Sequence, residues 1–152
     1  MRNAIVIISL SLALPAALAG EGSRKAPADP LLQQECGSCH VPFPPRLLGE
    51  TAWHKLMGSL DKHFGSDATL DPKTRQAIEA YLVANAARQE RLGTDGQSTL
   101  RITETAWYQR EHDEVGRAVW QRPSIKRASN CAACHSQADQ GSFSERQIHI
   151  PK

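Results

Sequence analysis

Residues 36–40 read Cys-Gly-Ser-Cys-His, and residues 131–135 read Cys-Ala-Ala-Cys-His. The two copies contain all 4 cysteines and two of the 6 histidines of the 152-residue chain. Cys-x-x-Cys-His is the attachment signal for c-type haem, because two sulfurs bond the porphyrin and the histidine ligates the iron. We therefore predict two covalently attached haem c groups. The attaching residues are Cys36, Cys39 and His40 in the first motif and Cys131, Cys134 and His135 in the second.

Three other uses of these cysteines fit the pattern less well. Disulfides are common in exported proteins, but a bridge within each motif closes almost no loop and does not require the histidine. Zinc ribbons pair their Cys-x-x-Cys knuckles across a short gap, whereas Cys39 and Cys131 lie most of the chain apart. A thioredoxin-like motif needs a βαβ context that the sequence lacks.

The first 19 residues have the pattern of a secretory signal peptide. Arg2 is followed by an apolar run over residues 4–14 and by Ala17-Leu18-Ala19, a small-x-small cleavage site. The run is too short for a membrane span, although an uncleaved anchor is the alternative. We expect cleavage near Ala19, a periplasmic mature protein over residues 20–152, and no membrane insertion after cleavage.

The composition predicts a thin protein core. Apolar residues make up 40% of the chain but aromatic residues only 5%. Two haems would supply apolar surface for the polypeptide to fold around. The formal net charge of +2 gives no electrostatic case for nucleic-acid binding.

The pattern of caps and breaks predicts a mainly α fold. We expect a short helix over 30–35, an extended proline-rich segment over 41–45, and helices over 51–64, 72–92 and 105–120. The tetrapeptide Glu-Thr-Ala-Trp occurs at 50–53 and at 104–107, and we expect both threonines to be N-caps. The Gly- and Asp-containing turn at 93–96 is the expected boundary between two small helical cytochrome c-like domains, each wrapped around one covalently bound haem. These domains are an N-terminal haem domain over 20–94 and a C-terminal haem domain over 95–152.

Helical spacing selects the second ligand of each iron. His63 falls close to the apolar stripe that contains Leu56 and Leu60, so it is the predicted distal ligand of the first haem. His112 shares a stripe with Tyr108 and Val115 and is the predicted distal ligand of the second haem.

Three rivals remain open as iron ligands. His54 lies off the apolar stripe and is expected to be solvated, and Met57 is expected to fill the core. His149 lies near the C-terminus, where chain segments are often mobile.

Several further segments together resemble the small periplasmic dihaem cytochromes c called DHC. They include Leu47-Leu48, Trp53, residues 57–60, His63-Phe64-Gly65, residues 110–112 and residues 130–135. The resemblance implies two low-potential haems, each with two histidine ligands, and His63 and His112 fall on the family's distal positions. It also implies redox partner proteins, among them a cytochrome of the sphaeroides haem protein kind and a membrane electron donor.

Ligation by two imidazoles leaves no open iron site, which favours electron transfer over enzymatic catalysis. The alternative is a haem sensor or small redox enzyme with one open coordination site. Four arginines are candidates to pair with the haem propionates: Arg46, Arg101, Arg110 and Arg117.

Because so much of the expected core is haem, we predict that the haem-free chain is poorly folded. Its far-UV circular dichroism should show less helix than that of the holoprotein. Identical spectra would contradict this prediction.

Overall fold

The computed structural model describes residues 29–152, so the predicted signal peptide lies outside the described part. Within residues 29–152 the regular structure is helical, with no strand but with isolated β-bridges, which confirms the mainly α class. The α-helices are α1 (Pro30–Cys36), α2 (Glu50–Met57), α3 (Pro72–Ala84), α4 (Ala106–Glu111) and α5 (Arg117–Trp120). Short 3-10 helices span Pro45–Leu47, Leu60–Lys62, Ile102–Glu104, Cys131–Ala133, Ala138–Gln140 and Glu145–Gln147.

Helices α1 and α3 begin at the predicted residues, and each follows an aspartate N-cap. The carboxylate of Asp29 accepts from the backbone N–H of Leu32 at 2.7 Å. Asp71 accepts from the N–H groups of Lys73 and Thr74 at 3.1 Å each. These bonds satisfy donors that a helix N-terminus leaves free. The cap of α1 matters for the site, because this helix ends at Cys36.

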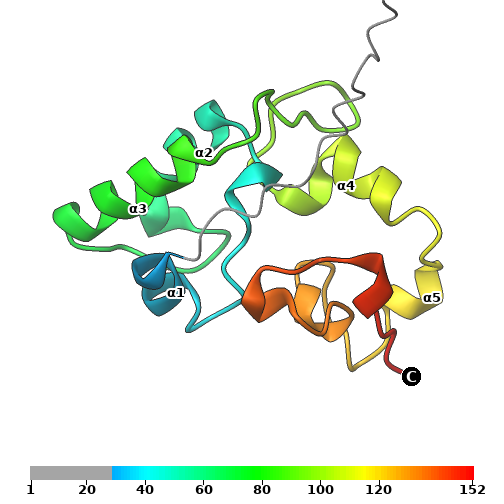
Figure 1. Ribbon diagram of the computed structural model, residues 1–152. Helices are drawn as coiled ribbons and strands as arrows, with labels where there is room; N and C mark the ends of the chain where they lie inside the picture. The colour runs from blue at the N-terminus through cyan, green and yellow to red at the C-terminus, as the bar shows by residue number, and fades with distance from the viewer. Residues whose placement is uncertain (1–28) are drawn as a thin grey trace, which may run out of the picture.

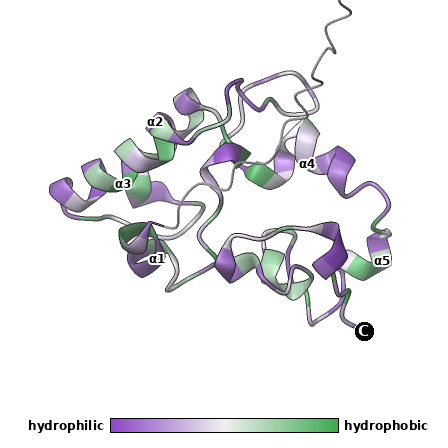
Figure 2. Cartoon of the chain, viewed as in Figure 1, coloured by the Kyte–Doolittle hydropathy of each residue, from purple (hydrophilic) through white to green (hydrophobic). Residues whose placement is uncertain are grey.

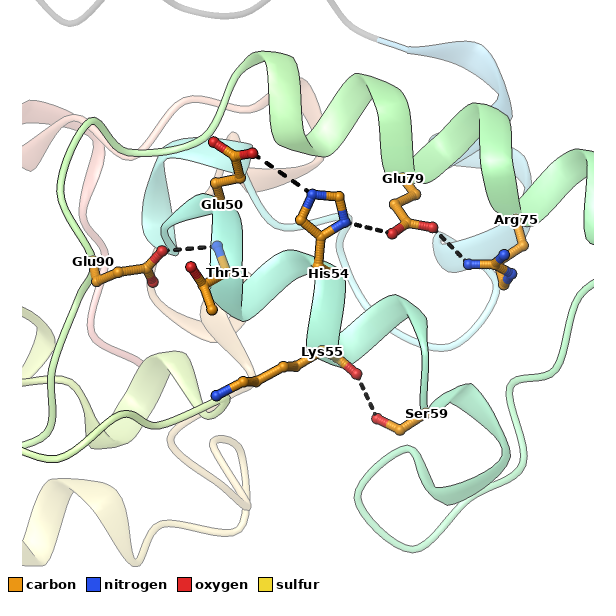
Figure 3. Close-up of polar contacts among 8 residues, drawn as sticks. All are labelled: Glu50, Thr51, His54, Lys55, Ser59, Arg75, Glu79 and Glu90. Carbon is orange, nitrogen blue, oxygen red and sulfur yellow. Dashed lines mark hydrogen bonds and ion pairs between the residues drawn. The ribbon is translucent and has the colours of Figure 1, made fainter.

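Helix α2 differs from the prediction at both ends. Its N-cap is Gly49, and Thr51 lies inside the helix with its N–H donating to the Glu90 carboxylate at 2.8 Å. The helix ends at Met57. There the Ser59 hydroxyl donates to the Lys55 carbonyl at 2.8 Å, a side-chain hydrogen bond that competes with the next backbone hydrogen bond of the helix (Figure 3).

Helix α3 ends at Ala84, eight residues before the predicted end near Leu92. The amide of Asn85 donates to the Tyr81 carbonyl at 2.8 Å and so satisfies part of the last turn. The chain then turns back, and the N–H of Ala87 donates to the Leu48 carbonyl at 2.9 Å. Continued helix would lose this contact with the segment that follows the first haem motif.

The predicted helix over 105–120 is two helices. Thr105 is the N-cap, as predicted, and its hydroxyl accepts from the N–H of Tyr108 at 3.1 Å. Helix α4 ends at Glu111 with His112 as its C-cap, and α5 starts after Gly116. The indole of Trp120 donates to the Val115 carbonyl at 3.1 Å across the break. Residue 112 therefore lies at a helix end and not on a continuous helix face.

The hydrophobic core lies in the first half of the chain. Helices α1, α2 and α3 lie together on one side of the molecule, and the C-terminal segments lie on the other (Figure 1). Figure 2 shows hydrophobic and hydrophilic residues alternating along α2 and α3, as expected of helices with one buried side. The core cluster is Leu32, Leu48, Ala52, Trp53, Leu56, Met57, Leu60, Ile78 and Leu82.

The second half has few buried side chains of its own. Its buried residues are Thr105, Tyr108, Ile125 and Ala138. Leu100 and Ile102, which follow the predicted domain boundary at 94/95, pack against the first-half core. The two halves are thus in contact, and the boundary itself stays a prediction. Within residues 29–152, no helix has the length and apolar character needed to cross a membrane.

The carboxylate of Glu90 is expected to act as a remote N-cap for α2. Glu90→Ala should lower the free energy of unfolding by about 1 kcal/mol, the usual cost of a lost cap, whereas Glu90→Gln keeps an acceptor oxygen and should lose less. Chemical denaturation of the holoprotein measures this, with Glu114→Ala as a control for removal of one exposed carboxylate. Equal free energies of unfolding for Glu90→Ala and Glu114→Ala would contradict the capping role.

Candidate haem sites

The first Cys-x-x-Cys-His motif starts at the last residue of α1 and continues as a tight turn. The N–H groups of Cys39 and His40 both approach the Cys36 carbonyl at 3.4 Å. Burial raises the pKa of the Cys36 thiol, while Cys39 is exposed. The Nδ1 of His40 lies 2.8 Å from the Val41 carbonyl and donates to it as the tautomer that leaves Nε2 free. This is the arrangement that a metal-bound histidine needs.

The ring of His63 faces the ring of His40. The two ring centroids are 6.2 Å apart with the planes 22° from parallel. His63 follows the 3-10 helix Leu60–Lys62 as its C-cap, so it does not lie on α2 as the periodicity predicted. The structure brings the predicted distal ligand beside His40, but the expected position on a helix face is wrong. Burial is the main cause that lowers the pKa of His63.

The second motif also has a second histidine ring opposite its own, but different local structure positions the two rings. The 3-10 helix Cys131–Ala133 carries the first cysteine, and the N–H of His135 donates to the Cys131 carbonyl at 2.8 Å. Burial raises the pKa of the Cys131 thiol to about 11. His112 lies opposite His135 with ring centroids 6.2 Å apart and planes at 74°.

Helix α4 orients the ring of His112. The Nδ1 of His112 lies 2.9 Å from the Tyr108 carbonyl, and the two rings stack with centroids 4.1 Å apart. As donor to that carbonyl, Nδ1 leaves Nε2 for a metal. By contrast, the Nδ1 of His135 is buried and has no hydrogen-bond partner within residues 29–152.

Both histidine pairs fit one iron between two imidazoles. Metal–imidazole bonds of about 2 Å on opposite sides of an ion separate the two ring centroids by about 6 Å. The separation is 6.2 Å in each pair. Each pair also has one histidine directly after a Cys-x-x-Cys sequence, so the cysteines and both rings can hold the same haem.

The rival ligands are engaged elsewhere. His54 lies between α2 and α3, with Nδ1 2.6 Å from a Glu79 oxygen and Nε2 3.7 Å from a Glu50 oxygen (Figure 3). Met57 is 3% exposed in the core cluster, as the sequence predicted. His149 is exposed, and its backbone N–H donates to the Cys134 carbonyl at 2.8 Å.

The C-terminal residues 147–151 are hydrogen-bonded to the rest of the second half, although the sequence suggested that they are mobile. An isolated β-bridge joins His135 to Ile148, and the Ser136 hydroxyl donates to the Gln147 carbonyl at 3.0 Å. The guanidinium of Arg122 donates to the Pro151 carbonyl at 2.6 Å. These contacts fix the backbone on either side of the exposed His149 side chain.

The alternative uses of the cysteines find no support in the geometry. None of the four cysteines, all of which lie in the described part of the chain, forms a disulfide. Among residues 29–152, no three His, Cys, Asp or Glu side chains gather as a metal cage.

Of the predicted propionate partners, Arg46 is half-buried, and burial lowers the pKa of its guanidinium. Arg110 and Arg117 line an open surface groove beside His112. Arg101 lies over the Phe64 ring, 4.4 Å from its centroid.

Sequence reasoning missed the aromatic residues around the proximal histidines. Phe43 stacks on His40 with ring centroids 4.8 Å apart, and Phe143 lies 5.2 Å from His135. Phe43 and Phe143 each follow the motif histidine closely in the sequence, which was the signal available. Arg91 was also missed: its guanidinium lies 5.2 Å from the Trp107 ring centroid, and its buried Nε has no partner in the described part of the chain.

Comparison with family models matches residues 32–143 to the dihaem cytochrome c family, DHC. The chain belongs to this family. As a member, it carries two haem c groups with iron and has a haem electron-transfer role.

Solved structures agree with the family match. The crystal structure of DHC purified from Rhodobacter sphaeroides is 43% identical over 78% of this chain and 99% of that chain, with a TM-score of 0.66. The dihaem cytochrome c of Shewanella baltica OS155 is 37% identical over 82% of this chain and 94% of its own, with a TM-score of 0.71. No curated protein is significantly similar in sequence.

The His54–Glu79 contact predicts a pH-dependent contribution to stability. The hydrogen bond to Glu79 raises the pKa of His54 above its ordinary value. A raised folded-state pKa stabilises the fold fully below the unfolded value of about 6.5, and this contribution disappears as pH rises through the folded value.

The His54 contribution should lower the melting temperature of the wild type slightly as the pH rises from about 6 to about 8. His54→Gln lacks this contribution, so its melting temperature should fall slightly less over the same range. Thermal melts of the holoprotein across this range measure the effect, and His149→Gln is the control for removal of an exposed histidine. A pH profile of His54→Gln parallel to that of the wild type would contradict the assigned contact.

Proposed function

We propose that this protein is a periplasmic electron carrier whose two low-potential haems are each closed by two histidines. The proximal ligands are His40 and His135, and the distal ligands are His63 and His112. The observation that supports this assignment is the equal 6.2 Å separation of the facing rings. Covalent attachment is assigned to Cys36 and Cys39 for the first haem and to Cys131 and Cys134 for the second.

The bound haems supply reversible one-electron chemistry at iron. The polypeptide's part is to hold ligands that do not change with oxidation state. Hydrogen bonds from Nδ1 to backbone carbonyls keep His40 and His112 in one tautomer and orientation. Rings fixed in this way leave little to rearrange when an electron arrives or leaves, and they leave no coordination position for a substrate.

The ligand set also predicts how the two reduction potentials compare with those of other cytochromes. Imidazole stabilises ferric iron better than a thioether does, so both potentials should lie below those of His/Met cytochromes. The buried position of Met57 supports this choice, because its side chain packs in the core cluster of α1–α3.

We also propose the partners that the family resemblance implies. A membrane electron donor would reduce the protein, and a soluble cytochrome of the sphaeroides haem protein kind would accept the electron. Export is supported by the signal-peptide pattern that ends at Ala17-Leu18-Ala19.

Removal of a distal histidine should open one iron and leave the other closed. In the ferric holoprotein, His63→Ala or His112→Ala should convert half of the haem absorbance to a high-spin spectrum, because the replaced side chain can no longer complete the coordination. His54→Ala and His149→Ala are the matched controls and should stay low-spin. A low-spin spectrum in either distal variant would overturn that assignment, and a high-spin wild type would favour the sensor or enzyme alternative.

Potentiometric titration tests the second part of the proposal. Both haems should titrate below a His/Met cytochrome c measured under the same conditions. A haem that titrates with the His/Met reference would contradict ligation by two histidines.

A further inference from the structure

The residue after His63 has an unfavourable backbone conformation. Phe64 has φ 50°, in the left-handed region, and it is followed by Gly65 with φ 96°. Glycine adopts such angles freely, but a bulky side chain rarely does. The Phe64 ring gains little from burial, because the residue is 44% exposed. A strained residue next to a functional group points to a role for its side chain.

The Phe64 ring contacts the imidazole of His63. The two centroids are 4.9 Å apart with planes at 55°, and a tight turn closed by the Ser66 N–H and the His63 carbonyl at 3.0 Å fixes the backbone. His40 and His112 have Nδ1 bonded to a carbonyl, whereas His63 has no side-chain hydrogen bond within residues 29–152. The contact with the Phe64 ring is therefore the side-chain contact that can orient the imidazole of His63.

Arg101 contacts the same Phe64 ring. Its guanidinium carbon lies 4.4 Å from the ring centroid, a cation–π contact. Arg101 is itself fixed, because its backbone N–H donates to the Thr99 hydroxyl at 3.1 Å and its Nε lies 3.4 Å from Glu104. The neighbouring Leu100 and Ile102 pack on the first-half core.

We propose that Phe64 and Arg101 are positioning residues for the distal ligand of the first haem. The Phe64 ring restrains the imidazole of His63, and the guanidinium of Arg101, from the second half of the chain, restrains that ring. This inference rests on the proposed ligation by His63. It makes the stability of one iron–histidine bond depend on a residue beyond the predicted domain boundary.

Cyanide binding to the ferric holoprotein reports on this restraint, because cyanide enters a closed haem only when a histidine leaves the iron. Phe64→Gly removes the ring, and glycine adopts the left-handed backbone without strain, so the variant should still fold. It should bind cyanide at one of the two haems roughly tenfold faster, the scale of lost outer-sphere support for a metal ligand. Phe64→Tyr keeps the ring and should restore the wild-type rate.

Arg101→Gln should speed cyanide binding less than Phe64→Gly does, because the ring stays. The double variant should bind no faster than Phe64→Gly alone, since the guanidinium acts through the ring and the two effects are then not additive. Arg75→Gln is the matched control: it removes a partly exposed guanidinium of α3 that pairs with Glu79. This control should bind cyanide at the wild-type rate.

Wild-type kinetics in Phe64→Gly, or additive effects in the double variant, would overturn the proposal. The His63→Ala variant separates this failure from failure of the proposed function. If His63→Ala opens the first haem and Phe64→Gly changes nothing, the positioning role alone is wrong. If His63→Ala leaves that haem closed, the ligand assignment is wrong.

Discussion

The pairing of two histidine rings beside each haem motif is the constraint on which the rest of the structure depends. The proposed ligation would need one ring on each side of an iron, yet the paired histidines come from different local structures. His40 follows a turn after α1, and His63 follows a 3-10 helix; His112 caps the end of α4, and His135 follows another 3-10 turn. None of the four lies inside a regular α-helix. Turns and helix ends therefore position all four rings.

The two halves meet this constraint with unequal protein cores. The first half packs α1, α2 and α3 around residues such as Leu48 and Ile78, both fully buried. The second half has short helices, few buried side chains and a C-terminal segment bonded to its haem motif. We infer that the second half depends more on its haem for order, because covalent attachment supplies apolar surface where the polypeptide has little.

The sequence predicted the attachment motifs, a first helix from Pro30, the caps Asp71 and Thr105, and the mainly α class, because each depends on a local pattern. Other features depend on distant contacts. Glu90 caps α2 from beyond α3, so Thr51 is not an N-cap although Thr105 is. Periodicity selected His63 and His112 as neighbours of the motif histidines, but it extended their helices too far. The first break lies where the Ser59 hydroxyl donates to the Lys55 carbonyl, and the second lies at His112, whose Nδ1 bonds the Tyr108 carbonyl.

Electron paramagnetic resonance of the oxidised holoprotein tests the central claim most directly, since it separates low-spin iron with two strong axial ligands from high-spin iron with an open position. Four histidines closing two haems predict two low-spin ferric signals that account for all the iron, with no high-spin signal. A high-spin signal that integrates to one of the two haems would contradict the account, because one of the facing imidazole pairs would then not be bound on both sides.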